Sequence, residues 1–431
     1  MSEVRTDNKP IRLKTTISKI QSGFWGDDPD GENDVICLRV ADFNRDNFMI
    51  NDMKLTLRSV SPKDKLPRIL KKGDLLIEKS GGGDNQPVGT VAYFNKEYEA
   101  ISSNFLSLLR PKPIHDGRFL CYLFATLYAS RINIKSIKQT TGIQNIDLES
   151  YLDEKALIPP LPIQKAIAAY LDKETTRIDA LIAKKERQIE LLQENRQAII
   201  TRAVTKGLDP NAKMKDSGVE WIGEIPEGWE VLPLRRVLKK VIDYRGRTPE
   251  KTDEGVQLVT SRNIKNGKID YEVSKEFVSY QEYKRIMERG QPEMGDVLFT
   301  SEAPLGEVAQ IDKIEVALAQ RIILFRTNER MDNRYLCLYL SSYLAKGEIT
   351  SKGSGSTAEG IRSDRLYSVN VIVPDRITQS EILNHCMDLM SNIDRTIKPI
   401  EKSISLLREY RSSLITAAVS GQIDVSQEIP E

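Results

Sequence analysis

Basic, amide and hydroxyl side chains gather in three segments of this sequence, and proteins use these side chains to contact nucleic acid. The segment SRINIKSIKQTTGIQN begins at Ser130, LRRVLKKVIDYRGRTP begins at Leu234, and KGEITSKGSGSTAEGIRSDR begins at Lys346. Cations and hydroxyls position a protein on phosphates, whereas Arg, Asn and Gln read base edges. The candidate DNA-contacting residues are Arg131, Lys135, Lys138, Gln139, Thr141, Gln144, Arg245, Arg247, Lys352, Ser354, Ser356 and Arg362.

A solvated loop is an equally good interpretation of each patch taken alone. That interpretation weakens because the first and third patches fall at equivalent places in two similar halves of the chain. Two short segments stay open as alternative contact sites, SGGGDNQPVG at 80–89 and DYRGRTP at 243–249. The glycine-rich segment could be a hairpin connection, a cofactor loop or a loop that touches nucleic acid. It lies between two predicted strands, whereas a phosphate cradle needs a turn from a strand into a helix.

Side chains for catalysis are sparse. The chain has only two histidines, His115 and His385, and neither is matched by a histidine in the other half. The metalloprotease, nucleophile-elbow and P-loop motifs are all missing. The four cysteines lie far apart without a CxxC pair, which argues against metal knuckles and disulfides and fits a reducing compartment. We therefore expect a binding protein with no catalytic residue, metal or cofactor of its own.

Bulk composition is that of an ordinary globular protein. The chain has 431 residues, enough for two to four domains, with 40% hydrophobic and 29% charged residues. The 63 Lys and Arg residues nearly balance the 62 Asp and Glu residues, so a nucleic-acid partner has to show itself in local patches. The sequence shows no signal peptide and no apolar run of membrane-spanning length, so we expect a cytoplasmic protein without a membrane partner.

An internal repeat organises the chain. The segments IDALIAKKERQIELLQENRQAIITRAVTKG, from Ile178, and IDRTIKPIEKSISLLREYRSSLITAAVSGQ, from Ile393, agree at thirteen of thirty positions. Further blocks match in the same order: KKGD with EMGD, RFLCYLFATLYAS with RYLCLYLSSYLAK, and LIPPLPIQKAI with VIVPDRITQSEI. Each half therefore consists of a β-rich unit followed by one long helix.

The pattern predicts an α+β fold with two β-rich domains in a pseudo-twofold repeat, separated by two long antiparallel helices. Short helices are expected at Phe119–Ser130 and Tyr335–Lys346, and the first long helix at Ile163–Lys206. The expected division is a first domain at 1–160, a first long helix at 161–210, a second domain at 211–375 and a second long helix at 376–431.

Apolar residues recur along both long helices at spacings of three, four and seven, as in a coiled-coil seam. One seam cannot bury itself, so the two seams are expected to bury each other. Pro399 should kink the second helix. The link KMKDSGVEWIGEIPEGWEVLPLRRV carries Trp221 and Trp229, and we expect both rings to cover the hydrophobic joint between the halves. The predicted seam residues are Ile167, Leu171, Ile178, Leu181, Ile182, Ile189, Leu192, Ile199, Ile382, Leu389, Ile393, Ile397, Ile400, Ile404, Leu407 and Leu414.

The chain resembles the specificity subunit of type I restriction–modification enzymes. The segments that carry the resemblance are IPPLPIQKAIAAYLDKETTRIDALI, AIITRAVTKGL and WIGEIPEGWEVLPL. The resemblance implies that each β-rich unit is a target recognition domain for one half of a split, asymmetric double-stranded DNA site, with the helices setting the spacer. It also implies two modification subunits that methylate adenine with S-adenosylmethionine and two restriction subunits that use ATP and magnesium. This chain would carry out none of those reactions.

A second hypothesis from another class is a coiled-coil scaffold that joins two heads binding ligands other than DNA. The recurrent basic loops favour the DNA reader. A self-contained methyltransferase is disfavoured by the missing catalytic motifs.

Overall fold

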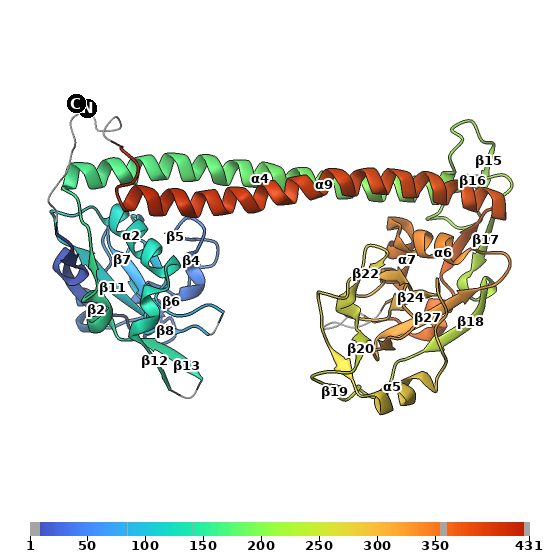
Figure 1. The fold of residues 1–431 in the computed structure, drawn as a ribbon, viewed down its shortest axis with the longest axis horizontal. Helices are drawn as coiled ribbons and strands as arrows, with labels where there is room; N and C mark the ends of the chain where they lie inside the picture. The colour runs from blue at the N-terminus through green and yellow to red at the C-terminus, as the bar shows by residue number, and fades with distance from the viewer. Residues whose placement is uncertain (1–8, 84, 141, 354–359, 426–431) are drawn as a thin grey trace. The chain divides into compact units, whose positions relative to one another are not determined.

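The computed structural model divides into two compact units (Figure 1). Unit 1 comprises Met1–Lys185 and Lys402–Glu431, and unit 2 comprises Glu186–Glu401. Each unit therefore holds one β-rich domain and one part of each long helix, α4 (Leu161–Lys206) and α9 (Arg376–Val419). The structure describes residues 9–83, 85–140, 142–353 and 360–425.

The domain of unit 1 is built around a six-stranded sheet of order β2-β11-β7-β9-β5-β4, antiparallel except where β5 pairs with β9. The unit also contains two three-stranded sheets, β10-β3-β6 and β12-β13-β8. The strands of unit 1 are β1 Ile11–Arg12, β2 Ile17–Ser22, β3 Asp34–Leu38, β4 Phe43–Asn44, β5 Met49–Ile50, β6 Leu57–Ser59, β7 Leu75–Glu78, β8 Ser80–Gly81, β9 Val91–Tyr93, β10 Ala100–Ser102, β11 Leu106–Pro111, β12 Ile137–Thr140, β13 Ile143–Ile146 and β14 Lys155–Ala156.

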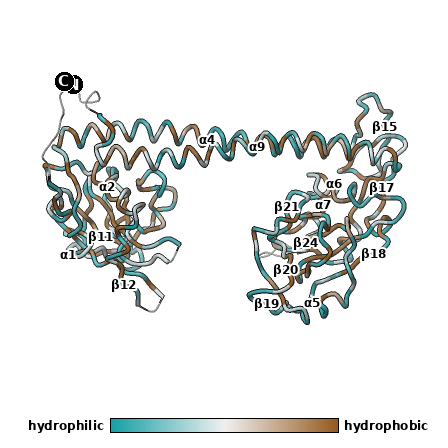
Figure 2. Tube along the Cα trace, viewed as in Figure 1, coloured by the Kyte–Doolittle hydropathy of each residue, from teal (hydrophilic) through white to brown (hydrophobic). Residues whose placement is uncertain are grey.

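Unit 2 repeats this plan with the order β18-β27-β24-β25, which corresponds to β2-β11-β7-β9 of unit 1. The parallel pair β20–β26 corresponds to β3–β10. Hydrophobic residues gather inside each domain, as around β11 and β24 (Figure 2). The strands of unit 2 are β15 Met214–Asp216, β16 Glu224–Pro226, β17 Glu230–Pro233, β18 Leu238–Asp243, β19 Lys251–Thr252, β20 Val256–Val259, β21 Ile264–Lys265, β22 Lys268–Ile269, β23 Phe277–Val278, β24 Val297–Thr300, β25 Val308–Gln310, β26 Ala317–Leu318, β27 Ile322–Thr327 and β28 Asn370–Val373.

The short helices agree with the sequence in unit 1 and depart from it in unit 2. The expected helix at 119–130 is α2, whereas the expected single helix at Tyr335–Lys346 is two helices, α6 and α7. The break falls at Ser342, whose backbone is extended and whose hydroxyl accepts a hydrogen bond from the Ala345 amide to cap α7. The short helices are α1 Pro62–Lys65, α2 Gly117–Ala129, α3 Leu148–Leu152, α5 Tyr280–Met287, α6 Asn333–Ser341, α7 Tyr343–Lys352 and α8 Ser363–Tyr367.

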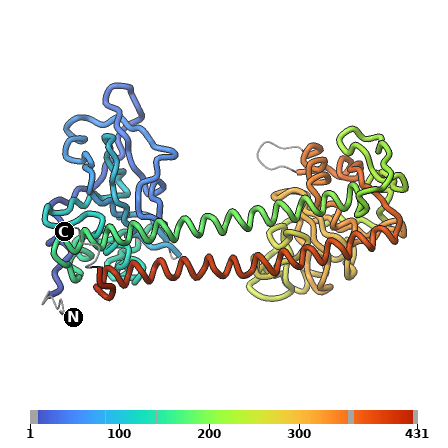
Figure 3. The backbone as a smooth tube through the Cα atoms, turned by 90° about the horizontal axis from the view of Figure 1, so that it is seen from above, coloured from blue at the N-terminus to red at the C-terminus, as the bar shows by residue number. Residues whose placement is uncertain are grey.

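The two long helices lie side by side within each unit (Figures 1 and 3). Asp179 of α4 pairs with Arg411 of α9 in unit 1, and Arg196 of α4 pairs with Asp394 of α9 in unit 2. The partner in α9 moves back along the chain as α4 advances, which is the pattern of an antiparallel pair. Most of the predicted seam residues are buried or half-buried, but Leu181 is exposed.

Two other expectations about the helical regions have mixed outcomes. Helix α9 is continuous through Pro399, and a kink there stays a prediction. Trp229 is buried in the core of unit 2, with its ring beside Gly207, whose positive φ ends α4. The expectation for Trp221 is wrong, since its side chain is 45% exposed. None of the described helices is both long and apolar enough to cross a membrane.

The matching KKGD and EMGD motifs form the same turn in both units. Gly73 and Gly295 adopt a positive φ, and the aspartate that follows each glycine is buried. In unit 1, Asp74 accepts two hydrogen bonds from the Arg110 guanidinium at 2.8 and 2.6 Å. In unit 2, Asp296 accepts the equivalent two bonds from Arg326 at 2.9 and 2.7 Å. These hydrogen bonds to aspartate raise the pKa of both arginines.

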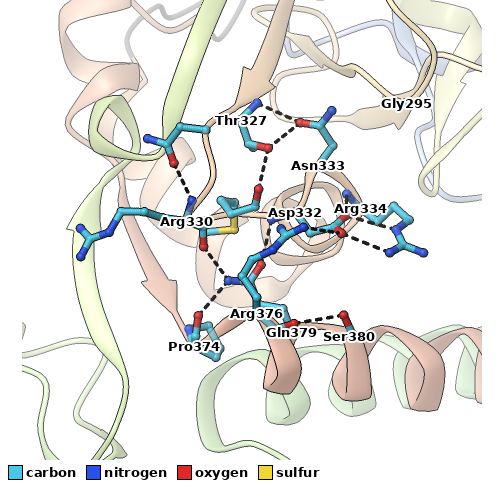
Figure 4. A network of polar contacts seen from close by, with 12 residues as sticks. Gly295, Thr327, Arg330, Asp332, Asn333, Arg334, Pro374, Arg376, Gln379 and Ser380 are labelled. Atoms are coloured by element: carbon cyan, nitrogen blue, oxygen red, sulfur yellow. Dashed lines mark hydrogen bonds and ion pairs between the residues drawn. The ribbon is translucent and has the colours of Figure 1, made fainter.

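A buried glutamine joins the start of each long helix to its domain. In unit 2 the Gln379 side-chain carbonyl accepts a bond from the Asp332 amide, and its NH2 group donates to the carbonyls of Arg330 and Pro374, each at 2.8 Å (Figure 4). Asp332 also caps α6, so one glutamine fixes α9 against that helix.

The equivalent glutamine of unit 1 makes two of these three connections. The Gln164 carbonyl accepts from the Asp116 amide at 2.8 Å, and its NH2 group donates to the Pro159 carbonyl at 2.7 Å. The NH2 nitrogen also lies 3.2 Å from Nδ1 of His115. Burial, helped by the charge of Lys112, lowers the pKa of His115.

Candidate nucleic-acid interface

The first basic segment of unit 1 forms the hairpin β12–β13, and the glycine-rich loop joins the same sheet through β8. Gln144 and Asn145 of β13 pair with Gly81 and Ser80 of β8. The basic segment and the glycine-rich segment, which the sequence left as an alternative contact site, therefore belong to one surface. We name this surface the hairpin region, and it comprises residues 80–83, 85–90, 131–140 and 142–146. A sheet of this kind holds loop side chains in fixed places, as sequence recognition requires.

Polar side chains hold the hairpin region together beneath its surface. Ser80 Oγ donates to Asn145 Oδ1 at 2.6 Å, and the Asn133 side-chain NH2 donates to the Val88 carbonyl at 2.7 Å. The Gln144 side chain is buried and accepts a bond from the Val88 amide at 3.3 Å. Gln144 thus supports the glycine-rich loop in this structure, and a DNA contact by its amide stays a prediction.

The remaining candidates of unit 1 lie on the outside of the hairpin region. Arg131, Lys135, Lys138 and Gln139 are exposed. Lys138 forms an exposed ion pair with Asp147 at 2.7 Å, which raises the pKa of Lys138 and lowers that of Asp147. Thr141 lies outside the described residues.

Unit 2 brings its basic segments together around residues 360–365. We name this surface the loop region, and it comprises residues 243–250, 300–306, 352–353 and 360–368. Arg245 is the centre of this region. Its guanidinium makes charge-assisted bonds with Asp243, donates to the Ile361 carbonyl at 3.2 Å and reaches the Ser363 hydroxyl. Burial alone would raise the pKa of Asp243, but the bonds from Arg245 outweigh burial and lower it.

The other candidates of unit 2 differ in how far their charges are compensated. Lys352 is half-buried, donates to Ser368 Oγ at 2.9 Å and lies 3.3 Å from Glu348 Oε1. Arg247 is exposed and pairs with Glu250.

Arg362 is mostly exposed and lies 3.4 Å from Asp364. The predicted contacts Ser354 and Ser356 fall outside the described residues.

The loop region repeats the backbone pairing of the hairpin region. Glu302 and Gly360 form an antiparallel bridge, and the Ile361 amide donates to the Ser301 carbonyl at 3.1 Å. This bridge corresponds to the pairing of β8 with β13, because the segment after β24 matches the segment after β7 in sequence. In each unit, the loop that follows the equivalent strand, β7 or β24, therefore lies beside a basic loop. That basic loop follows helix α2 in unit 1 and helix α7 in unit 2.

The chemistry available in both regions is that of binding. Guanidinium, ammonium and amide groups dominate, and these groups hold phosphates and read base edges. Across the described parts of the chain, three or more His, Cys, Asp or Glu side chains nowhere gather in a way that could hold a metal ion.

A comparison with models of known protein families shows to which family the chain belongs. A model described as the type I restriction modification DNA specificity domain matches residues 44–191 and again residues 226–407. The chain belongs to this specificity-domain family. The two matches confirm the internal repeat and the sequence-recognition role expected from the residues.

Relatives and solved structures agree with this assignment. The chain is 25% identical over 396 residues to the type I restriction enzyme MjaVIII specificity subunit of Methanocaldococcus jannaschii, covering 89% of this chain and 85% of the relative. It is 23% identical to the EcoKI specificity subunit of Escherichia coli K12, covering 81% of this chain and 75% of the relative. Its fold resembles a chain solved in work on complex assembly and conformational transition of the type I R–M system, with a TM-score of 0.69, 14% identity and coverage of 97% and 99%. The relatives are specificity subunits, and the expectation of a non-catalytic specificity subunit is confirmed.

Proposed function

We propose that this specificity subunit reads a bipartite, asymmetric double-stranded DNA site, with unit 1 reading one half-site and unit 2 the other. The observation that carries this proposal is the recurrence of the loop pairing after β7 and β24 in two domains that both match a DNA specificity model. The two domains differ in the side chains that these loops present, as recognition of two different half-sites requires. Helices α4 and α9 would set the spacer between the half-sites.

The reactions belong to partner subunits in this proposal. Two modification subunits would dock on the helical regions and methylate adenine with S-adenosylmethionine, and two restriction subunits would use ATP and magnesium in the cytoplasm. The residues of this chain supply binding and orientation only.

Mapping of N6-methyladenine in DNA from cells with and without this gene tests the proposal. We expect two short half-sites at a fixed spacing to lose methylation when the gene is absent. Replacing residues 1–155 by the equivalent domain of a relative should change one half-site and leave the other. The scaffold alternative predicts no change in methylation and no gel shift of duplex DNA at low salt, and either result would overturn our proposal.

Single substitutions in the hairpin region should separate base reading from phosphate binding. Gln139→Ala should relax one base position of the unit 1 half-site, costing about 1–3 kcal/mol of discrimination. Lys138→Ala should weaken binding to all duplexes alike. The exposed Lys155 in β14 gives a matched control, and Lys155→Ala should change neither property. Plasmid methylation at two salt concentrations measures both effects, and unchanged methylation for Gln139→Ala would remove this residue from the recognition surface.

A further inference from the structure

Unit 1 contains a hollow of about 420 Å³ where α2, the glycine-rich loop and the last part of α9 meet. Four guanidinium groups from three separate segments line it, and none of the described residues in its wall is acidic. Hydroxyl and amide side chains fill much of the remaining wall. We name this site the arginine hollow, and its cations are Arg45, Arg131, Arg408 and Arg411.

Charge compensation around the arginine hollow is incomplete. Arg411 is paired with Asp179 at 2.9 Å, and Arg45 lies 3.6 Å from the buried Glu78 and donates to Thr90 Oγ1 at 2.9 Å. The exposed guanidinium of Arg131 makes no hydrogen bond or ion pair with any described residue. The wall therefore contains at least one cation, Arg131, that no described carboxylate compensates, and with no acid among its described residues it favours an anion.

Backbone strain concentrates at the same place. Phe48 and Arg131 both line the hollow with a positive φ, 57° and 59°, although neither is glycine. A bulky residue in this conformation is held there by its surroundings, and such residues cluster at functional sites. Asn266 of unit 2 has a φ of 53° and lines the equivalent hollow of that unit. Three of the four such residues in the described parts of the chain thus lie in these two hollows.

The hollow of unit 2 shows that the feature recurs with the sequence repeat. It measures about 360 Å³ and is lined by Arg196, Gln197 and Ile200, which the repeat aligns with Arg411, Ser412 and Ile415 of the arginine hollow. Three cations and one acid line it, whereas four cations and no acid line the arginine hollow. The residues are Arg196, Lys268, Arg334 and Asp394.

We propose that the arginine hollow, Arg131 included, binds phosphodiester oxygens of the DNA backbone, while β12 and β13 of the hairpin region contact the bases. Guanidinium groups bind phosphate through paired charge-assisted hydrogen bonds, which suits a wall rich in arginine. DNA is the source of phosphate because the hollow and the hairpin region share the glycine-rich loop: Gln86 and Pro87 line the hollow, and Tyr128 donates to the Pro87 carbonyl at 2.8 Å. This inference rests on the proposed function.

The test compares Arg131→Gln and Arg408→Gln with Arg131→Lys and with the control Lys72→Gln, in the complex with the methyltransferase subunits. Lys72 is an exposed cation of the same unit, paired with Glu97 away from the hollow. Affinity for a duplex carrying the site and for an unrelated duplex is measured from low to high salt. Each glutamine variant should bind both duplexes about five- to tenfold more weakly at 0.1 M salt and lower the salt slope by about 0.9. Arg131→Lys should keep most of the slope, and the methylated sequence should be unchanged in every variant.

The outcomes separate this inference from the proposed function. If the wild-type complex showed no sequence-specific methylation, the proposed function itself would be contradicted. Sequence-specific wild-type methylation together with unchanged salt slopes in both glutamine variants would overturn the arginine hollow alone, as would losses no larger than those of Lys72→Gln. A changed base preference would make the hollow a base-reading site. Stabilisation of the DNA-free chain by millimolar inorganic phosphate, abolished in Arg408→Gln without any effect on DNA affinity, would assign the hollow to free phosphate.

Discussion

Replacing Arg326 by methionine is expected to lower the free energy of unfolding of unit 2 by about 3–5 kcal/mol, because the substitution leaves a buried carboxylate without its cation. Asp296 is 1% exposed and receives two bonds from the Arg326 guanidinium at 2.9 and 2.7 Å. Its remaining bond, from the Glu293 amide, shapes the turn before β24 but carries no compensating charge. Methionine keeps much of the volume of the arginine stem, so the loss measures charge and hydrogen bonding.

A matched exposed arginine and a double variant complete this experiment. Arg330 pairs with Glu230 at 3.3 Å with both side chains about half exposed, so Arg330→Met should cost less than about 1 kcal/mol. Adding Asp296→Asn to Arg326→Met should recover much of the loss, since no buried charge is then unpaired. Urea unfolding followed by fluorine NMR of labelled tryptophan separates unit 2, with Trp221 and Trp229, from unit 1, with Trp25. Equal losses for Arg326→Met and Arg330→Met would contradict the predicted importance of the buried pair.

The turn at Asp296 also shows where sequence analysis succeeds and where it stops. The match of KKGD with EMGD aligned Gly73 and Asp74 with Gly295 and Asp296, and the structure shows that these residues form equivalent turns. The arginine partners could not be predicted, since Arg110 and Arg326 lie on strands far along the chain and become neighbours only when the sheet forms. The same holds for Gln379. It aligns with Gln164 in sequence, but the sequence alone could not identify the amides and carbonyls of other segments to which both side chains bond.

The exposure of the candidate contact residues was predictable to a similar degree. Exposed cations of one segment, such as Lys135 and Lys138, were found from composition alone. The arginine hollow was missed because Arg45 and Arg408 come from opposite ends of the chain. The burial of Gln144 was missed because the alternation that turns a side chain inward depends on pairing with β8. Short-range sequence patterns therefore predict helices, strands and charged segments. A site that is built from several of these elements can be recognised only in the folded structure.

Reversing one charge of the pair that joins the long helices should have an effect of comparable size in unit 1. Arg411 is 8% exposed as a residue, and its guanidinium binds Asp179 at 2.9 and 3.3 Å. Arg411→Asp would set two carboxylates against each other at the helix interface, and we expect a loss of about 3–5 kcal/mol. Asp179→Arg should cost a similar amount for the opposite reason. The reversal Glu409→Arg, at an exposed position of the same helix, should change stability by less than about 0.5 kcal/mol.

The double reversal Asp179→Arg with Arg411→Asp decides between pairing and general charge effects. If the ion pair fixes the register of α4 against α9, the reversed pair should regain most of the stability that each single change loses. Reversal at Arg196 and Asp394, the equivalent pair of unit 2, should behave in the same way without affecting Trp25. Thermal unfolding followed at the labelled tryptophans measures each unit separately, and methylation of DNA with lengthened and shortened spacers reports the register. A doubly reversed chain no more stable than the single variants would show that the helices are held in place by their apolar seam alone.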